Sequence, residues 1–343
     1  MQAALITGRQ RIERREFPEP EAAPGAAVLR VDRCGICGTD VAAWRAGTPY
    51  APFLCGHEWV GTVLAIGRGV KEVREGDRAV MGVPVACGRC GECRAGHATR
   101  CAAIMALAYG AHPLTPPHGG YAPRIAVPAE ALVCVPAALP LDAAAMVEPA
   151  TVALHAVRRR SPRLGDRVLV LGAGPIGLFA LQLAHAAGAG EVFVLEPAAA
   201  RRALAMELGA TAALAPGPDA SASIRARTVE SLGVDLVYEC SGAQSAMDAA
   251  FDLVRPGGAI MLIGVSGEGV RLDPLACITK EVVLDNSTAH HHHEFGITMD
   301  LMLDGRLRTT PIHSRTIDLD GLDAGFEALA RGEAAKVLVA PGD

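Results

Sequence analysis

The feature that most constrains the fold is a strand, a glycine turn and a helix in direct succession at residues 167–189. RVLVLGAG (167–174) is an apolar run of strand length, and PIGLFALQLAHAAGA (175–189) continues as an apolar helix with Pro175 in its first turn. A strand that is apolar throughout belongs to a sheet covered on both faces. The segment therefore predicts a parallel sheet with helices packed on either side.

Strands and helices go on alternating after this segment. We expect further strands at EVFVLE, VDLVYECSG and AIMLIGV, with helices at AARRALAMELGA and QSAMDAAFDLVRPGG, and the alternation ends near Asn286. This pattern predicts an α/β fold with a doubly wound parallel sheet, the Rossmann arrangement. The tail GFEALARGEAAKVLV adds one helix and one strand.

The first part of the chain differs in composition and in the length of its apolar runs. Residues 1–135 are rich in Gly, Pro, Val and Cys, and AAVLRVDRC, GTVLAIG and DRAVMGV resemble short strands of a compact β domain. The 343 residues, half of them hydrophobic, suffice for about two domains. We therefore expect a β-rich domain and a separate Rossmann domain.

Charge and hydropathy exclude several classes of protein. The formal net charge is −5 and Arg158–Arg160 is the one basic run, which argues against a nucleic-acid partner. The N-terminus lacks the uninterrupted apolar region of a signal peptide, and no run of about 18 apolar residues suggests a membrane span. We expect a cytoplasmic protein whose cysteines stay reduced.

The glycine turn has the G-x-G-x-x-G spacing of dinucleotide-binding proteins, in the required context between a strand and a helix. The first glycine permits the turn, the second lets the backbone approach a pyrophosphate, and the third lets helix and strand pack closely. The helix N-terminus offers free N–H groups to the phosphates. A nucleotide-free relative of this fold is the alternative. The expected cofactor contacts in this turn are Gly172, Gly174, Pro175, Ile176 and Gly177.

Glu196 ends the next expected strand, 24 residues after Gly172. A carboxylate there can accept hydrogen bonds from both ribose hydroxyls and would repel a 2′-phosphate, which favours NAD over NADP. Arg201, which we include among the cofactor contacts, and Arg202 lie close enough to keep NADP open. A bare surface glutamate is the other alternative.

Four cysteines crowd into CGRCGECRAGHATRC at residues 87–101. In a reducing compartment such a cluster indicates metal ligands before disulfides. Four thiolates at these spacings suit a closed tetrahedral zinc site, which is structural and does no chemistry. Disulfides or free thiols are the alternatives. The expected ligands are Cys87, Cys90, Cys93 and Cys101.

A second set of possible ligands lies upstream in RCGICGTD and CGHEWVG. Cys37, His57 and Glu58 are candidates for a zinc that keeps one position open for substrate. A buried structural histidine is the alternative for His57.

Together these motifs resemble the zinc-dependent medium-chain dehydrogenase/reductases, the alcohol and polyol dehydrogenase superfamily that includes sorbitol- and threonine-dehydrogenase-like members. The matching stretches are CGICGTD, GHEWVGTV, the four-cysteine segment, VEPATVALHAV, GDRVLVLGAGPIGL and GEAAKVLV, in the order of the family. The resemblance implies a GroES-like β-rich catalytic domain at 1–150 with a structural zinc lobe at 87–101, a Rossmann NAD-binding domain at 151–287, and a return to the catalytic domain at 288–343.

The resemblance also implies roles for single residues. Cys37 and His57 would bind the catalytic zinc, with Glu58 as a neighbouring or exchangeable ligand. Glu148, where many alcohol dehydrogenases have cysteine, matches the glutamate of polyol-type members and is a further candidate ligand. Thr39 matches the hydroxyl that takes the proton of the substrate.

Three further positions follow from the same comparison. Asp40 matches a carboxylate that orients His57, and Lys336 matches a basic residue near the cofactor phosphates. Ala42 stands where many relatives have a proton-relaying histidine.

Two further sets of residues are expected at or near the cleft. His290–His293 falls where relatives bring a loop near the cleft; we expect it to lie idle on the surface, with substrate contact or metal binding as alternatives. Trp44, Trp59 and residues around Tyr109–Tyr121 are the expected pocket walls.

The expected function is reversible hydride transfer between NAD and a polyol, aminocyclitol or secondary alcohol, with two zinc ions per chain, one catalytic and one structural. A threonine-dehydrogenase-like oxidation of an amino alcohol, a zinc-free reductase and a non-catalytic nucleotide-binding relative are the alternatives. The partners would be a small-molecule substrate and further copies in a homodimer or homotetramer, paired through the Rossmann sheet edge near AIMLIGV.

Overall fold

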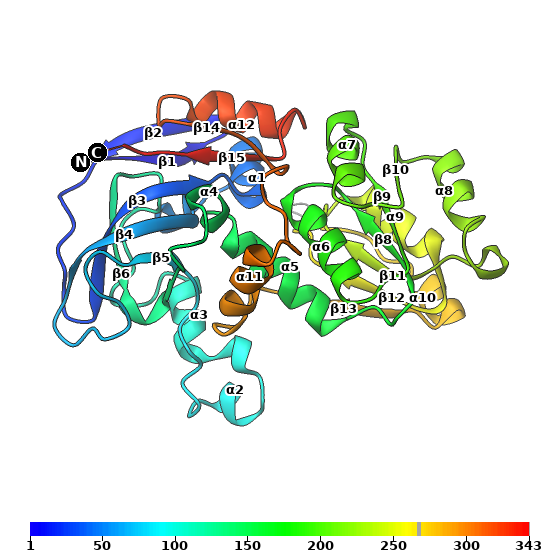
Figure 1. Ribbon diagram of the computed structural model, residues 1–343, viewed down its shortest axis with the longest axis horizontal. Coiled ribbons are helices and arrows are strands. Elements are labelled where there is room, and N and C mark those ends of the chain that lie inside the picture. The colour runs from blue at the N-terminus through cyan, green and yellow to red at the C-terminus, as the bar shows by residue number, and fades with distance from the viewer. Residues whose placement is uncertain (266–268, 343) are drawn as a thin grey trace.

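The computed structural model describes residues 1–265 and 269–342 and places them in two regions side by side (Figure 1). A β-rich region holds both termini, and a parallel-sheet region forms the opposite end of the molecule. Helices α5 (Val147–Arg159) and α11 (Glu294–Leu303) lie between them. The expected α/β fold class, a GroES-like part with a Rossmann part, is confirmed.

The parallel-sheet region has the strand order β10-β9-β8-β11-β12-β13, and every neighbouring pair is parallel. Its strands are β8 (Arg167–Leu171), β9 (Glu191–Leu195), β10 (Ala212–Leu214), β11 (Val234–Glu239), β12 (Val254–Leu262) and β13 (Val283–Asn286). Its helical segments are α6 (Pro175–Ala186), α7 (Ala199–Glu207), α8 (Pro218–Arg225), η4 (Val229–Ser231), α9 (Gln244–Leu253) and α10 (Pro274–Lys280). Strand order reverses beside β8, so the glycine turn lies at the switch point where such sheets bind ligands.

One boundary differs from expectation. The sequence predicts a helix up to the Pro-Gly-Gly at 256–258, but α9 ends at Leu253 and β12 begins at Val254. Val254 pairs with Val234 of β11. Pairing with a neighbouring strand starts β12 before the turn residues, a tertiary effect that local signals do not contain.

The β-rich region combines a seven-stranded sheet with a two-stranded ribbon. Its strands are β1 (Gln2–Gly8), β2 (Arg11–Glu16), β3 (Ala26–Gly35), β4 (Glu58–Ile66), β5 (Arg78–Met81), β6 (Arg124–Pro128), β7 (Leu132–Cys134), β14 (His313–Ile317) and β15 (Lys336–Val339). Its helical segments are α1 (Gly38–Ala46), η1 (Pro52–Leu54), η3 (Ala129–Ala131), α4 (Leu141–Ala144) and α12 (Leu322–Ala330). Because β15 pairs with β3, the C-terminal segment completes a sheet that the N-terminal segment begins.

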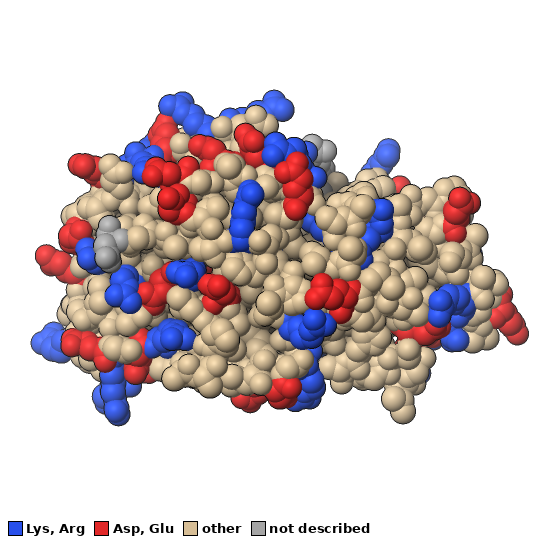
Figure 2. Space-filling model, turned by 45° about the horizontal axis from the view of Figure 1, so that its top comes forward, with Lys and Arg blue, Asp and Glu red and all other residues tan. Residues whose placement is uncertain are grey.

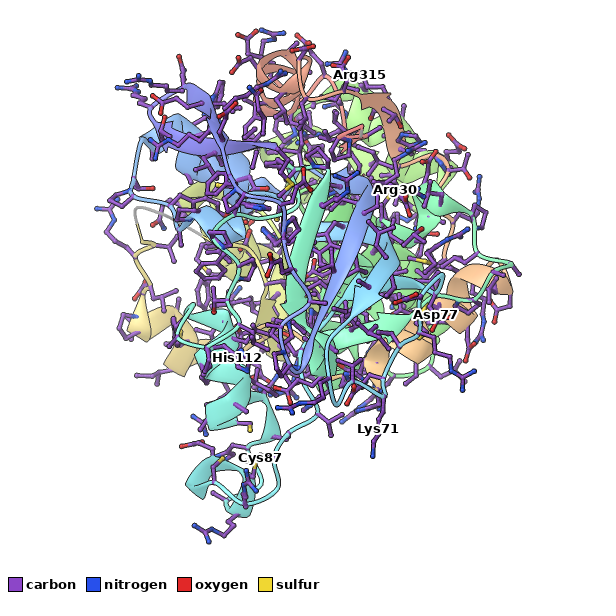
Figure 3. The ribbon with its side chains drawn as sticks, turned by 90° about the vertical axis from the view of Figure 1, so that its left-hand side faces the viewer. Arg30, Lys71, Asp77, Cys87, His112 and Arg315 are labelled. Atoms are coloured by element: carbon purple, nitrogen blue, oxygen red, sulfur yellow. The ribbon has the colours of Figure 1, made fainter. Side chains whose placement is uncertain are left out.

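The four cysteines lie on a segment that projects from the β-rich region, here called the cysteine lobe (residues 87–101). Figure 3 shows Cys87 on this projection, away from the main sheet. The lobe contains α2 (Gly91–Arg94) and η2 (Ala98–Arg100), and α3 (Ala102–Ala108) follows it directly. The lobe is thus joined to the body of the protein through α3.

One apolar cluster connects the two regions. It runs from Val60 and Val80 of the β-rich sheet to Phe179 of α6 and Phe295 of α11. Within it, the hydroxyl of Thr151 on α5 donates to that of Thr298 on α11 over 2.9 Å. Each buried phenylalanine contributes roughly 2–3 kcal/mol by removal from water.

Charged side chains of both signs lie across the face of the molecule shown in Figure 2. Acidic and basic side chains are interspersed there without a large patch of one sign (Figure 2). Within the described residues, no helix combines the length and the hydropathy needed to cross a bilayer.

Candidate functional site

Cys37, His57 and Glu58 converge on one point, and we call them the cleft cluster. Their ligand atoms all lie within 4.8 Å of one another. The antiparallel register of β3 and β4 explains this meeting, because Gly35 at the end of β3 pairs with Glu58 at the start of β4. Cys37 then follows as the N-cap of α1.

Thr39 lies within the first turn of α1, beside the cluster. Its hydroxyl donates to Cys37 Sγ over 3.2 Å and is 3.4 Å from the hydroxyl of Tyr50. A side chain that both accepts and donates therefore stands next to the candidate metal ligands.

The orientation of His57 differs from expectation. Its Nδ1 is 3.0 Å from the carbonyl oxygen of Leu54, but 3.8 Å from Asp40 Oδ1, which is longer than a hydrogen bond. Asp40 instead accepts from the Tyr121 hydroxyl over 2.7 Å and from the Cys37 N–H over 3.3 Å. The backbone of η1 therefore orients the imidazole. Asp40 stabilises the turn that carries Cys37.

Lys336 comes from the far end of the chain and pairs with Glu58. Its ammonium donates to Glu58 Oε2 and, over 3.0 Å, to the carbonyl oxygen of Ile36. Both side chains of the pair are almost fully buried. The structure thus brings Lys336 to the cleft cluster, and a role at the cofactor phosphates stays a prediction.

Glu148 lies beside the cluster and not within the set of atoms 4.8 Å apart. It is in the first turn of α5, and its Oε1 is 3.2 Å from His290 Nε2. His290 is only 4% exposed, so the expectation of an idle surface run is wrong for this residue. Its Nδ1 is buried without a hydrogen-bond partner.

The other histidines of the run are also engaged. His292 Nδ1 is 2.8 Å from the carbonyl oxygen of Val83, and the rings of His291 and His293 stack 5.5 Å apart. The N–H of His291 donates to Glu294 over 2.7 Å, and His155 on α5 contacts the same carboxylate over 2.9 Å. The run therefore joins α11 to α5 and to the loop after β5.

The electrostatics of the cluster favour a cation. Burial and the nearby Glu58 carboxylate raise the pKa of Cys37. Burial alone would lower the pKa of His57, but Cys37 and Asp40 outweigh it and hold that pKa well above its usual value. For Lys336, Glu58 likewise outweighs burial and raises the pKa. These acidic groups attract positive charge, and the thiol and imidazole are ligands that zinc prefers.

A cavity of about 200 Å³ adjoins the cluster. His57, Glu148 and His290 are its ionisable lining residues. Trp59 lines it as expected, whereas Trp44 packs against Phe326 in the core and Tyr121 is buried against Asp40. The rest of the lining is apolar: Phe53, Leu54, Met81, Gly82, Val83, Ile104, Leu107, Ala108, Pro116, Ile125, Val127 and Ala289.

The cysteine lobe forms a second ligand set. The four sulfur atoms of Cys87, Cys90, Cys93 and Cys101 lie within 4.8 Å of one another, and all four thiols are free. Backbone N–H groups of Ala102 and Cys93 lower the pKa of Cys90 to about 6. Burial would raise the pKa of Cys101, but hydrogen bonds from backbone N–H groups outweigh it and lower that pKa as well. Four convergent sulfurs, two of them favoured as thiolates, fit a closed tetrahedral site.

The glycine turn fits a dinucleotide. Gly172 has φ +90°, in the left-handed region that favours glycine, and a Cβ at Gly177 would overlap with the carbonyl oxygen of Gly172. A Cβ at Gly174 would meet nothing within 4 Å, so its backbone borders open space. Pro175 and Ile176 begin α6 above this space.

Glu196 and Arg201 are both engaged within the protein. Glu196 accepts from the N–H of Ala173 in the glycine turn over 2.7 Å and from that of Ala198 over 2.9 Å. Arg201 donates to the carbonyl oxygens of Ala334 and Leu329, 2.8 Å and 3.1 Å away. Arg201 thus ties α7 to the segment before β15. A carboxylate keeps lone pairs beyond two such bonds, so a ribose role for Glu196 stays a prediction.

Sequence reasoning did not single out Glu239, which ends β11. Its carboxylate accepts from the N–H groups of Ser241 and Gly242 over 2.8 Å and 3.0 Å. Because β11 pairs with β8, this loop lies beside the glycine turn, and Ser241 is the nearest neighbour of Gly172. An acidic residue at the end of a buried strand was the available signal.

Two family models match the chain, an alcohol dehydrogenase GroES-like domain at residues 23–137 and a zinc-binding dehydrogenase at residues 175–304. Among curated proteins, an L-threonine 3-dehydrogenase of Streptomyces avermitilis is 30% identical over 94% of this chain and 94% of its own length. A probable D-xylulose reductase A of Aspergillus clavatus is 28% identical over 98% of this chain and 95% of its own length.

Among solved structures, a putative zinc-binding dehydrogenase from Sinorhizobium meliloti bound to NADP superimposes with a TM-score of 0.83 at 30% identity. The match covers 99% of both chains. The likeness therefore extends over both regions and over their relative arrangement.

Proposed function

Because the chain belongs to the zinc-dependent medium-chain dehydrogenase/reductase family, we propose that it interconverts a secondary alcohol or polyol and its ketone, with NAD as cofactor. Its reaction class is oxidoreduction at CH–OH groups, as in the relatives named above. The observation that carries the proposal is the cleft cluster, with Thr39 beside it and the cavity adjoining it.

Cys37 and His57 would hold the catalytic zinc, because a thiol and an imidazole are ligands that zinc prefers and their ligand atoms converge with that of Glu58. Glu58 is neutralised by Lys336 and would serve only as an exchangeable ligand. Glu148 would contribute from the side of the cavity, through its carboxylate beside His290. When bound, zinc supplies a Lewis acid for the substrate hydroxyl. A second, structural zinc would occupy the cysteine lobe.

The residues around the cluster would accept the proton of the substrate hydroxyl and pass it on. Thr39 Oγ1 would accept the proton of the substrate hydroxyl, with the Tyr50 hydroxyl 3.4 Å away as its next partner. Burial raises the pKa of Tyr50, so this phenol stays protonated and can only exchange hydrogen bonds. With Ala42 in place of a relaying histidine, the onward path would run through water.

The glycine turn and Glu196 would hold the dinucleotide. The free N–H groups at the start of α6 would face the pyrophosphate, and the Glu196 carboxylate would accept from the ribose hydroxyls. When bound, the nicotinamide supplies the hydride acceptor. Arg201 would favour NAD further, because its Nε and Nη2 already donate to two carbonyl oxygens, which leaves only Nη1 for a 2′-phosphate.

A cytoplasmic homodimer or homotetramer is the proposed assembly. Strand β13, and not β12 as expected from AIMLIGV, forms the edge of the parallel sheet. Val283 on this strand is 45% exposed, and Leu275 and Ile278 on α10 are 66% and 72% exposed. An open strand edge next to exposed apolar side chains favours pairing with a second copy.

The test is NADH formation with polyols, cyclitols, amino alcohols and secondary alcohols, with and without a zinc chelator. Chelator-sensitive turnover of one class supports the proposal. A protein that binds neither zinc nor NAD and oxidises nothing would instead be a non-catalytic relative.

A second candidate is oxidation of an amino alcohol such as threonine. The Glu148 carboxylate faces the cavity and could accept hydrogen bonds from a substrate ammonium. Turnover of L-threonine above that of matched alcohols without an amino group would favour this candidate.

A further inference from the structure

The ionisable side chains of the cavity beside the cleft cluster form one group, and most of the other lining side chains are apolar. Among the described residues that line it, His57, Glu148 and His290 are the ionisable ones, and Glu148 and His290 already bond to each other over 3.2 Å. The hydrogen-bonding capacity left for a substrate is therefore small, and it is concentrated where the carbinol must bind.

Apart from the indole N–H of Trp59, the remaining side chains of the wall cannot hydrogen-bond. Ile104 and Leu107 lie three residues apart on α3, so they share one face, and both are largely buried at this wall. Phe53 and Val127 line the cavity from other elements. A substrate hydroxyl against these side chains would lose its bonds to water without replacement.

The size of the cavity suits a small ring. A dry apolar cavity of about 150 Å³ admits benzene. A cavity of about 200 Å³ therefore accommodates a six-membered ring.

We propose that the substrate is a compact, apolar secondary alcohol of the size of an alicyclic ring, and not a polyhydroxylated ring or chain. This inference rests on the proposed function and narrows it. In the reaction, the carbinol carbon would lose a hydride to NAD⁺ and the hydroxyl would lose its proton, leaving a cyclic ketone, NADH and one proton. The apolar wall would hold the ring while the polar end takes the single hydroxyl.

The test compares three alcohols that share one ring: cyclohexanol, trans-cyclohexane-1,2-diol and myo-inositol. Each hydroxyl placed against the apolar wall should lower kcat/KM by about tenfold. The kcat/KM of cyclohexanol should thus exceed that of myo-inositol by at least about a hundredfold. The kcat/KM of the diol should lie between these two values or near that of cyclohexanol, because Glu148 or His290 can hydrogen-bond to a neighbouring hydroxyl. Equal or better turnover of myo-inositol would overturn the inference while leaving the proposed function intact.

A variant of the wall gives a second readout. Ile104→Ala enlarges the cavity, so it should raise the ratio of kcat/KM for 4-ethylcyclohexanol over cyclohexanol by about tenfold. Ala102→Ser, on the exposed side of the same helix, is the matched control and should leave the ratio unchanged. A ratio unaffected by Ile104→Ala in a folded, active protein would contradict the inference. Silence with every alcohol tested would overturn the proposed function and this inference together.

Discussion

The cleft cluster and the cysteine lobe both gather possible zinc ligands, but they are built in opposite ways. The lobe takes four thiols from fifteen consecutive residues, and its sulfurs face one another. The cleft cluster takes a thiol from the N-cap of α1, an imidazole from the loop before β4 and a carboxylate from β4 itself. Lys336 of β15 pairs with that carboxylate. The lobe leaves no ligand position open, whereas the cluster adjoins a cavity.

This difference distinguishes a candidate structural metal site, the lobe, from a candidate catalytic one, the cleft cluster. A closed set of four like ligands can only hold a fold together, while a mixed, buried set beside a cavity can bind and polarise a substrate. The two sites nevertheless meet at α3, because Cys101 is its N-cap and Ile104 lines the cavity. The lobe thereby supports one wall of the candidate active site.

The largest expected effect is the loss of activity when a ligand of the cleft cluster is replaced. Cys37→Ser should lower kcat on the order of 10³-fold, because a hydroxyl is a much poorer zinc ligand than a thiolate. NAD binding and the melting temperature should change little. Steady-state kinetics and cofactor titration measure this, with Cys134→Ser at an exposed cysteine as control. Wild-type turnover in Cys37→Ser would remove the cluster from the chemistry.

The next effect concerns the buried pair of the cluster. Lys336→Met leaves the Glu58 carboxylate buried without a partner and should cost about 3–5 kcal/mol of unfolding free energy. Adding Glu58→Gln should recover much of that loss, because the orphaned charge is gone. Urea unfolding of both variants measures the coupling. A loss below about 1 kcal/mol for Lys336→Met would mean that the pair does not organise the cluster.

A lobe variant should change stability more than chemistry. Cys90→Ser should release the structural metal and cost about 2–3 kcal/mol, with turnover per folded molecule retained within a few-fold. Metal analysis and thermal unfolding measure this, and Arg94→Ala in the same lobe is the control. Unchanged zinc content and melting temperature would argue against a structural metal there.

The smallest effect concerns the cofactor. Glu196→Ala should lower the preference for NAD over NADP by about tenfold, because the repulsion of a 2′-phosphate is removed. Glu191→Gln, at the start of the same strand β9, is the control. Steady-state kinetics with NAD and with NADP measure this preference. An unaltered ratio would confine Glu196 to holding Ala173 and the glycine turn.

Local motifs predicted the parts of the molecule that are local in space. The glycine turn lies between β8 and α6 as expected, and the four thiols of the lobe converge as their spacing predicts. The residues expected in the cleft also meet, apart from Glu148, which lies to one side. The hydrogen-bond partner of the His57 ring was missed, because it is the carbonyl oxygen of Leu54, 3.0 Å from Nδ1, whereas Asp40 lies 3.8 Å from the same nitrogen.

His290 shows why such partners escape sequence reasoning. It stands in a run of four histidines that composition assigns to the surface, yet it is buried against Glu148, 142 residues earlier in the chain. Lys336 and Glu58 are 278 residues apart. Contacts of this separation depend on how α11 and β15 dock, and no local pattern encodes that.

The sequence by itself determined the class of the fold and the ligand types of both candidate metal sites, because these follow from hydrophobic periodicity and from the chemistry of closely spaced residues. The family followed from the resemblance of its motifs, in their order along the chain, to those of known members. The tertiary structure decided what surrounds those ligands: the buried lysine on Glu58, the histidine beside Glu148, and the apolar wall on α3. Burial and charge act through space, so the environment that sets reactivity and substrate choice exists only once distant segments have packed together.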